Sequence, residues 1–251
     1  MSNLKYYNSP HGTRIAYHKT EGSKPGVMFL GGFMSDMDGG KALALEAHCK
    51  KVGRAFIRFD YQGHGKSSGD FENGTIGLWT MDALAVLDHL TEGPQLLVGS
   101  SMGGWTALLC AKARPGRVKC LVGIAAAPDF TTRMWNEELS EAQRQTILRE
   151  GLVKVPTEYG PEPYILTQAL FDDGYQNRVL NAPLHLDIPI RLIQGMSDKD
   201  VPWQTALNIT RALTSSDVDI ILVPDGDHRL SEPQDLARLT RVVDELVSLV
   251  G

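Results

Sequence analysis

QLLVGSSMGGWTALLCAKAR, residues 95–114, joins a short apolar run to a helix-compatible run through a serine flanked by glycines. Gln95–Val98 predicts a buried strand, and Met102–Arg114 predicts a helix whose small residues would let it approach a sheet closely. Ser101 lies between them, in the Gly-x-Ser-x-Gly motif of residues 99–103. A sharp strand–turn–helix connection of this kind exposes the serine oxygen above the sheet, so we predict Ser101 as a nucleophile.

The motif has a second copy at residues 65–69, GKSSG, which is centred on Ser67. This copy continues into residues 70–74, DFENG, whose composition is typical of a loop, so Ser67 is the disfavoured nucleophile. The same segment resembles the end of a phosphate-binding P-loop, but position 60 is Asp where that pattern needs Gly. A dinucleotide-binding fingerprint also fails, because position 68 is Ser. We therefore predict no cofactor.

Apolar runs of strand length alternate with helical patterns along the whole chain. The predicted strands are Leu4–Asn8, Thr13–His18, Val27–Leu30, Ala55–Phe59, Leu96–Val98, Leu121–Ala125, Ile190–Ile193 and Val218–Val223. Nearly continuous apolar strands with helices between them indicate a parallel sheet that is covered on both faces. We predict an α/β fold with a mostly parallel eight-stranded sheet, helices on both faces, and a single domain spanning residues 1–251.

One long segment interrupts this alternation. About sixty residues separate Pro128 from Ile188, which is too many for a bare loop in a compact domain. Glu137–Glu150 and Tyr164–Leu180 have helical patterns, the second with an interruption at Gly174, so we predict that residues 129–187 form a lid insertion. Extra helical packing without a gating role is the alternative. The aromatic residues that could line an acyl pocket here, or simply pack, are Trp135, Tyr159, Tyr164 and Phe171.

Serine is a weak nucleophile unless a neighbouring base accepts its proton. Among the seven histidines, His228 ends the loop PDGDH, residues 224–228, which directly follows a predicted strand. Loops at the carboxyl ends of strands are where α/β sheets gather functional residues, so we predict His228 as the base. His64 also follows a predicted strand and remains the alternative.

The base needs a carboxylate that holds its orientation and tautomer. Residues 194–202, QGMSDKDVP, follow the predicted strand Ile190–Ile193. We predict Asp198 in this loop as the acid, with Asp200 as the near alternative and Asp129 as a more distant one.

A serine nucleophile of this type also needs two N–H donors for the developing oxyanion. Met102 follows the nucleophile at the start of a helix and supplies the first backbone N–H. The strand Val27–Leu30 ends in GGFM, residues 31–34, and we predict the Phe33 amide as the second donor. An ordinary tight turn is the alternative interpretation of Gly31 and Gly32.

The composition disfavours several other classes. Lys plus Arg number 25 against 30 Asp plus Glu, a net charge of −5, so the chain has no overall attraction for nucleic acid. The longest strongly apolar run, Leu121–Ala127, is far shorter than the ~20 residues of a membrane-spanning helix. Asp225, Asp227 and His228 offer metal ligands, but no second histidine lies four residues further on, so we predict no metal.

Cys49, Cys110 and Cys120 cannot all pair, and they lack the spacing of metal ligands. We interpret them as buried thiols in a reducing compartment. The first thirty residues include Glu21 and contain no apolar signal core, so we expect neither a secretory nor a transit peptide. The expected location is cytoplasmic.

Six short segments carry a resemblance to known proteins: GFMSDM (32–37), IRFDY (57–61), GSSMGGW (99–105), VPW (201–203), DVDIIL (217–222) and DHR (227–229). The whole chain resembles the α/β-hydrolase superfamily, in which nucleophile, acid and base follow the same chain order. The six segments are similar to the mitochondrial palmitoyl-protein thioesterases, also described as mycophenolic acid acyl-glucuronide esterases. This resemblance implies Ser101, Asp198 and His228 as the catalytic triad.

The resemblance further implies a serine hydrolase that cleaves acyl esters or thioesters through an acyl-enzyme. Its expected partner is a small-molecule or acylated substrate. An esterase for small esters or acyl glucuronides, without a thioesterase role, is the alternative. A ligand-binding protein with a dormant triad is a second alternative, because a fold alone does not establish an activity.

Overall fold

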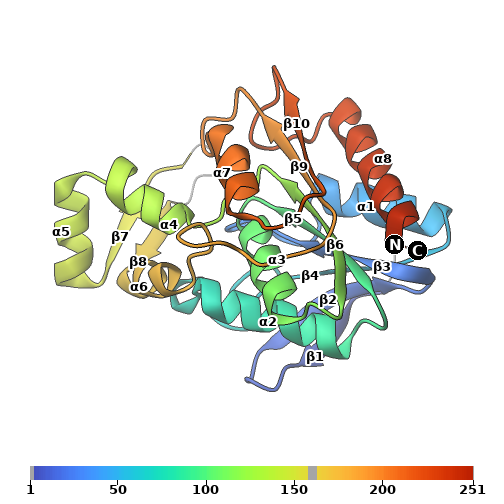
Figure 1. Ribbon diagram of the computed structural model, residues 1–251. Coiled ribbons are helices and arrows are strands. Elements are labelled where there is room, and N and C mark those ends of the chain that lie inside the picture. Colours follow the sequence, from blue (N-terminus) through green and yellow to red (C-terminus); the bar gives the residue numbers. More distant parts are fainter. Residues whose placement is uncertain (1–2, 158–162, 251) are drawn as a thin grey trace.

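An eight-stranded sheet crosses the centre of the molecule (Figure 1). The computed structural model describes residues 3–157 and 163–250. The strand order is β1-β2-β4-β3-β5-β6-β9-β10; β2 pairs antiparallel with β1 and β4, and all later pairs are parallel. The bounds are β1 Lys5–Asn8, β2 Arg14–Thr20, β3 Ser23–Leu30, β4 Arg54–Phe59, β5 Gln95–Ser100, β6 Val118–Ile124, β9 Ile190–Gly195 and β10 Val218–Val223. The predicted mostly parallel eight-stranded sheet is confirmed.

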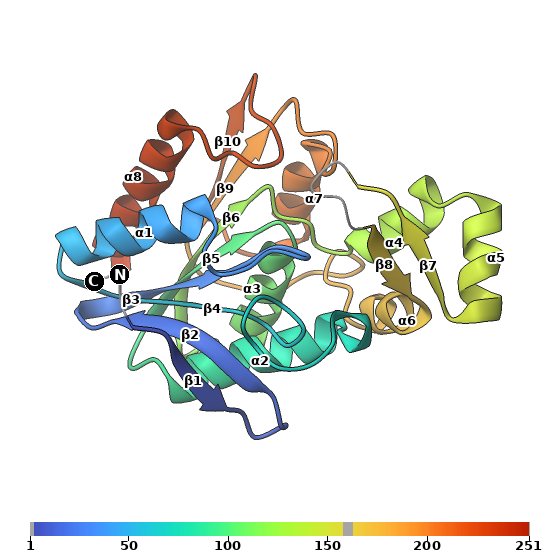
Figure 2. The same ribbon diagram turned by 180° about the vertical axis from the view of Figure 1, so that it is seen from behind.

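Helices cover both faces of this sheet because successive strand residues point to opposite sides. Val27 packs with α1 and α8 on one face, whereas Met28 packs with α2, α3 and α7 on the other. Figure 2 shows α1 and α8 together on the side of the sheet away from α2 and α3. The bounds are α1 Gly40–Lys51, α2 Ile76–His89, α3 Met102–Ala113, α7 Gln204–Ala212 and α8 Pro233–Val250, and a short 3-10 turn, η1, spans Phe71–Asn73.

The segment between β6 and β9 stands out to one side of the sheet (Figures 1 and 2). Its elements are α4 Phe130–Arg133, the π-helical turn η2 Met134–Glu138, α5 Glu141–Glu150, β7 Leu152–Val155, β8 Tyr164–Thr167 and α6 Gln168–Gln176. β7 and β8 pair antiparallel as a separate two-stranded sheet.

Two helical predictions for this segment were wrong in part. The predicted helix Glu137–Glu150 starts only at Glu141, because Ser140 and Gln143 form a capping box there. The predicted helix Tyr164–Leu180 begins as the strand β8, whose backbone pairs with β7. Helix α6 follows and continues through Gly174. Tyr159 lies outside the described residues.

Asp129 connects the start of the inserted segment to the residues that follow α6. Its carboxylate accepts hydrogen bonds from Val179 N at 2.9 Å and from Leu180 N at 3.0 Å. Leu166 of β8 and Leu170 of α6 belong to the same hydrophobic cluster as the sheet and α3. The insertion therefore packs onto the main core. Within the described residues, no helix is long and apolar enough to cross a membrane.

Candidate active site

Ser101 lies at the sharp turn between β5 and α3, with φ of 54° and ψ of −120°. This positive-φ conformation is unfavourable for a side-chain-bearing residue and is found mainly where a structure has a functional reason for it. Two backbone hydrogen bonds hold the turn: Ser101 N donates to Ile124 O at 2.9 Å, and Ala127 N donates to Ser101 O at 3.0 Å. The serine side chain is therefore presented by a rigid turn at the carboxyl edge of the sheet.

Gly99 and Gly103 allow α3 to start this close to the sheet. A Cβ atom on Gly99 would lie 2.2 Å from Gly103 O, and one on Gly103 would lie 2.1 Å from Leu30 O. Neither approach is possible for real atoms, so a side chain at either position would force the backbone apart. The glycines on both sides of the serine are thus a steric requirement of the turn.

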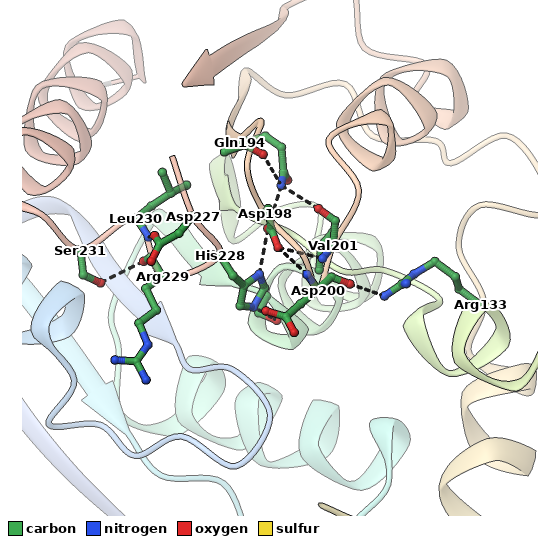
Figure 3. A network of polar contacts seen from close by, with 12 residues as sticks. Arg133, Gln194, Asp198, Asp200, Val201, Asp227, His228, Arg229, Leu230 and Ser231 are labelled. Carbon is green, nitrogen blue, oxygen red and sulfur yellow. Dashed lines mark hydrogen bonds and ion pairs between the residues drawn. The ribbon is translucent and has the colours of Figure 1, made fainter. Parts of the chain in front are cut away.

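His228 bridges Ser101 and Asp198. Its Nε2 lies 3.1 Å from Ser101 Oγ, and its Nδ1 lies 2.9 Å from Asp198 Oδ2. Figure 3 shows the imidazole between the loop that follows β9, which carries Asp198, and the chain after β10. The carboxyl ends of parallel strands meet at one edge of a sheet, and the structure brings together there the three residues that the sequence predicts as a triad.

The carboxylate of Asp198 is fully buried and faces four donors. Besides His228, Gln194 Nε2 donates to Oδ2 at 3.0 Å, and Asp200 N and Val201 N each donate to Oδ1 at 2.9 Å. Burial on its own raises the pKa of Asp198, but the hydrogen bond and charge of His228 and the two backbone N–H groups outweigh it. The pKa of Asp198 therefore lies below its ordinary value, and the group is negatively charged at neutral pH.

The loop after β3 carries Phe33 next to the nucleophile. A Cβ atom on Gly32 would lie 3.4 Å from Ser101 Cβ, so this loop packs directly against the serine. Ser35 closes the loop into a turn, because its N and Oγ donate to Gly32 O at 3.2 and 2.8 Å. Met102 is the first residue of α3 and follows Ser101 directly. Both predicted oxyanion donors are therefore neighbours of Ser101.

The Phe33 ring sits in an aromatic cluster that we call the Phe33 cluster. Its edge-to-face partners, with the distances between ring centroids, are Phe71 at 4.9 Å, Trp79 at 5.9 Å, Phe130 at 5.6 Å and Tyr164 at 5.4 Å. Phe71 and Trp79 precede β5 in the chain, whereas Phe130 and Tyr164 belong to the insertion. Edge-to-face pairs contribute about 0.5–1.5 kcal/mol each beyond their buried area. The loop beside Ser101 is thus packed against both the main body and the insertion.

Ser101 and His228 open onto a cavity of 930 Å³, a volume in the range that holds small-molecule ligands. Its wall on the side of the insertion is mostly apolar and includes Phe130, Met134, Leu139, Val155 and Leu166. Its wall near the start of α1 and after His228 is polar and includes Ser35, Asp36, Lys41, Arg229 and Ser231. The cavity therefore has an apolar end and a polar end.

The alternative nucleophile and base have other contacts. Ser67 Oγ donates to Asp60 O at 2.6 Å and accepts from Ala16 N at 2.8 Å, so it ties its loop to β2. His64 is buried, and its Nδ1 lies 3.1 Å from Gln62 O. Neither residue is among those that line the cavity.

The alternative acids are also placed differently. Asp200 lies on the cavity wall beside Asp198, but the His228 Nδ1 contact is with Asp198. Asp129 instead binds the backbone at the far end of the insertion, as described above. Its burial raises the pKa of Asp129, and the two backbone N–H groups partly offset this.

One grouping of possible metal ligands is found within residues 3–157 and 163–250. It consists of Asp198, Asp200 and His228, whose ligand atoms lie within 4.8 Å of one another, and it does not include Asp225 or Asp227. Both ring nitrogens of His228 already face Asp198 and Ser101. A metal here would displace those contacts, so the donor set fits a triad better than a metal site.

The fold and this site define the class of protein. Residues 26–173 match the family described as serine aminopeptidase, S33. The chain belongs to this family and is a hydrolase with the α/β-hydrolase fold. Within the class it is of the ABHD10 thioesterase type, as its similarity to individual proteins indicates.

The chain is 39% identical over 247 residues to the human protein named palmitoyl-protein thioesterase ABHD10, mitochondrial. The aligned region covers 98% of this chain and 80% of the human protein. The solved structure of alpha/beta hydrolase domain-containing protein 10 from mouse has a TM-score of 0.93 and 38% identity over 100% of both chains. A putative hydrolase from Agrobacterium vitis S4 has the same TM-score at 39% identity, covering 98% of both chains. Est1E from Butyrivibrio proteoclasticus, with ferulic acid bound, shares the fold at 20% identity and a TM-score of 0.81.

The expected cytoplasmic location is wrong. The curated relatives from orangutan, human and cattle are all named as mitochondrial proteins, which points to a mitochondrial location instead. The three cysteines are free and buried in the structure. Buried, unpaired thiols fit any compartment that keeps thiols reduced, so they do not distinguish the cytoplasm from a mitochondrion.

Sequence reasoning missed several residues around the site. Gln194 is the next-to-last residue of β9 and binds Asp198, and its only signal was a polar side chain near the end of an apolar strand. Lys41 and Arg229 line the polar end of the cavity. Nothing in the local sequence distinguishes these two from ordinary surface cations, although Arg229 directly follows His228.

Proposed function

We propose that this protein hydrolyses acyl esters or thioesters through a covalent acyl-enzyme on Ser101. The observation that carries the proposal is the continuous contact from Ser101 Oγ to His228 Nε2, and from His228 Nδ1 to Asp198 Oδ2. This arrangement lets an imidazole accept the serine proton while a buried carboxylate stabilises the imidazolium that forms.

In the first half of the reaction, Ser101 Oγ attacks the acyl carbonyl carbon and His228 Nε2 takes the hydroxyl proton. The carbonyl oxygen becomes an oxyanion, which the backbone N–H groups of Phe33 and Met102 stabilise. Two such donors are needed because the negative charge develops mainly in the transition state; the loss of one typically costs about 10²–10³ in turnover.

The intermediate then collapses, and the bond to the leaving alcohol or thiol breaks. His228 gives its proton to that leaving group, and the acyl group remains bonded to Ser101 Oγ. A water molecule attacks the acyl-enzyme while His228 accepts one of its protons, and the free acid and the Ser101 hydroxyl are restored.

The acyl group belongs, in this proposal, at the apolar end of the cavity. We infer that residues 129–187 act as a lid within the single domain of residues 1–251, since the apolar wall comes from α4, η2, β7, β8 and the residue that follows η2, all within this segment. A relative whose name describes a palmitoyl-protein thioesterase supports a fatty acyl group and a thioester bond. An esterase for smaller polar esters is the second candidate, favoured by the polar end of the cavity.

The test is covalent labelling by a fluorophosphonate together with hydrolysis of p-nitrophenyl octanoate and octanoyl-N-acetylcysteamine. Wild type and Ser67→Ala should be labelled and should hydrolyse both substrates, whereas Ser101→Ala should do neither. The exposed Ser248→Ala serves as a control for the purified variants. Labelling of Ser101→Ala at the wild-type rate would refute the assignment, and a wild type that neither reacts nor hydrolyses would leave a ligand-binding role.

A further inference from the structure

The loop that carries Asp198 lies between β9 and α7 and belongs to neither, so side chains must hold its backbone in place. Gln194 of β9 holds the loop from the sheet: its Nε2 donates to Asp198 Oδ2 at 3.0 Å and to Val201 O at 3.1 Å. Arg133 holds the loop from the insertion, because its Nη2 donates to Asp200 O at 2.5 Å. Figure 3 shows the Arg133 side chain reaching this loop from a different part of the chain.

A single peptide group, the one that joins Asp200 to Val201, connects Arg133 with Asp198. Its carbonyl oxygen accepts the hydrogen bond from Arg133, and its N–H donates to Asp198 Oδ1 at 2.9 Å. A peptide group is planar, so a partner that fixes the carbonyl also fixes the direction of the N–H. A hydrogen bond to the carbonyl also polarises the group and makes its N–H a stronger donor. Arg133 therefore acts on the Asp198 carboxylate through this peptide group.

The insertion holds Arg133 itself in position. Arg133 is the last residue of α4, and its backbone N–H donates to Asp129 O at 3.3 Å. Its Nη1 forms an ion pair with Glu138, while its Nη2 makes the hydrogen bond to Asp200 O. A guanidinium presents its N–H groups in one rigid plane, so the contact with Glu138 helps to orient the contact with Asp200.

Arg133 also lines the cavity, between Phe130 and Met134 of the apolar wall, so a role in substrate binding is the alternative. The two roles have different consequences. A residue that only contacts the acyl chain affects the binding of long acyl groups. A residue that positions Asp198 affects the reaction of every substrate, because each reaction depends on the orientation of His228.

We propose that Arg133 is a positioning residue for the catalytic acid. From the insertion it fixes the peptide group between Asp200 and Val201, whose N–H in turn holds the Asp198 carboxylate against His228. The inference rests on the proposed function, because it needs Asp198 to orient the base. It gives the insertion a part in the chemistry in addition to the apolar wall that it supplies, since displacement of the insertion would remove this support from the acid.

Hydrolysis of p-nitrophenyl acetate and p-nitrophenyl octanoate by Arg133 variants tests the inference. Arg133→Met should lower kcat about tenfold for both esters, the loss expected for one charged hydrogen bond, and should change KM for the acetate less than twofold. Arg133→Lys keeps a cationic donor and should lose less than about threefold. The matched control is Arg149→Gln, which removes an exposed arginine of α5 that pairs with Glu150 and should leave both constants unchanged.

A double variant shows whether Arg133 acts through Asp198. In Asp198→Asn the orienting carboxylate is already lost, so the addition of Arg133→Met should lower kcat less than twofold further. A further tenfold loss in that background would overturn the inference, because Arg133 would then act independently of Asp198. A higher KM for the octanoate alone, with kcat unchanged, would also overturn it and make Arg133 part of the acyl wall.

A measurement without hydrolysis separates this inference from the proposed function. The Asp198 carboxylate only accepts hydrogen bonds, so His228 Nδ1 carries a proton that NMR can follow in ¹⁵N-histidine-labelled Ser101→Ala. Arg133→Met in this background should speed the exchange of that proton with water about tenfold, because exchange requires the contact to open. Faster exchange supports the inference even if neither ester is hydrolysed, and exchange as slow as in Arg149→Gln refutes it.

Discussion

Asp198 holds a negative charge at a fully buried position because four donors face its carboxylate. Replacement by Asn keeps the shape but offers an N–H₂ group where His228 needs an acceptor, so the imidazole would adopt the wrong tautomer. We expect Asp198→Asn to lower kcat about 10³–10⁴-fold in steady-state ester hydrolysis. Asp200→Asn, which alters the neighbouring carboxylate, should lower kcat less than tenfold. The reverse ranking would make Asp200 the orienting acid.

The low pKa of Asp198 also has a consequence for stability. A carboxyl group whose pKa is lower in the folded chain than in the unfolded chain stabilises the fold at neutral pH. That contribution is complete above the unfolded pKa of about 3.9 and is lost as the pH falls through the lower folded value. Asp198 is therefore charged over the whole neutral range in which the proposed reaction would be measured.

His64 lies in a buried aromatic pocket made by Tyr61, Phe71 and Trp79. Its Nδ1 lies 3.1 Å from Gln62 O, while its Nε2 is buried with no hydrogen-bond partner among the described residues. Burial lowers the pKa of His64 to about 4. The folded protein thus keeps this imidazole neutral at a pH where an unfolded chain protonates it.

The sign of the pH effect follows from that difference. Between about pH 6.5 and pH 4 the unfolded chain binds the proton that folded His64 refuses, so the free energy of unfolding decreases as the pH falls. The free energy of unfolding of wild type, measured by urea titration, should be about 2 kcal/mol lower at pH 5 than at pH 7 from this group alone. His64→Gln should be less stable at pH 7 but show a smaller difference between the two pH values. The exposed residue His89 provides the control variant His89→Gln. If the free energy of unfolding changes equally between pH 7 and pH 5 in all three proteins, His64 is not the source of the pH effect.

Single residues differ in how well the sequence indicates their place. Ser101, Asp198 and His228 each follow a predicted strand, and parallel strands bring such residues to one edge, so their proximity could be predicted. Lys41 and Arg229 could not be assigned to the cavity in advance. Their position depends on how α1 and the loop after β10 pack together, which no local pattern encodes.

At the scale of elements, the insertion depends on Asp129 for its attachment. Asp129 has a left-handed φ of 57°, and its carboxylate receives both Val179 N and Leu180 N. Removal of the carboxylate leaves two N–H groups without their acceptor and places alanine in an unfavourable conformation.

We expect Asp129→Ala to lower the free energy of unfolding by about 2–4 kcal/mol and to increase cleavage within residues 129–187 during limited proteolysis. Asp129→Asn tolerates the left-handed conformation and keeps one acceptor oxygen, so it should lose about half as much. Asp172→Ala removes an exposed carboxylate from α6 and is the matched control. Equal stability of Asp129→Ala and Asp172→Ala in urea titrations would show that the hydrogen bonds from Val179 N and Leu180 N to Asp129 do not contribute to the free energy of unfolding.

Whole elements were predictable where a run of apolar residues lies between polar loops. Val218–Val223 has the same ends in the sequence prediction and in the structure, because an apolar strand between polar loops has clear limits. Tyr164–Thr167 was predicted as helix and is a strand, since a short apolar run fits both patterns. Its pairing with Leu152–Val155, nine residues or more away, decided the outcome.

At the scale of the whole molecule, the Phe33 cluster joins the insertion to the loop beside the nucleophile. Tyr164 and Phe130 come from the insertion, and Phe71 and Trp79 come from the main body. A displaced insertion would remove two of the four rings around Phe33. The lid that we propose would therefore affect the position of the Phe33 N–H as well as the access of substrate.

The same geometry predicts how the activity depends on acyl length. Each methylene group buried against Phe130, Met134, Leu139, Val155 or Leu166 contributes about 0.8 kcal/mol, or about a fourfold gain in kcat/KM. We expect kcat/KM for p-nitrophenyl esters to rise from acetate through octanoate and then to level off once the apolar end is filled. The matching N-acetylcysteamine thioesters should follow the same trend, because the acyl group is the same.

Leu166→Ala should lower kcat/KM for the octanoate ester about tenfold or more, while kcat/KM for the acetate ester should change less than twofold. A rate that falls with acyl length would assign the apolar wall to packing alone and favour the esterase for small polar substrates.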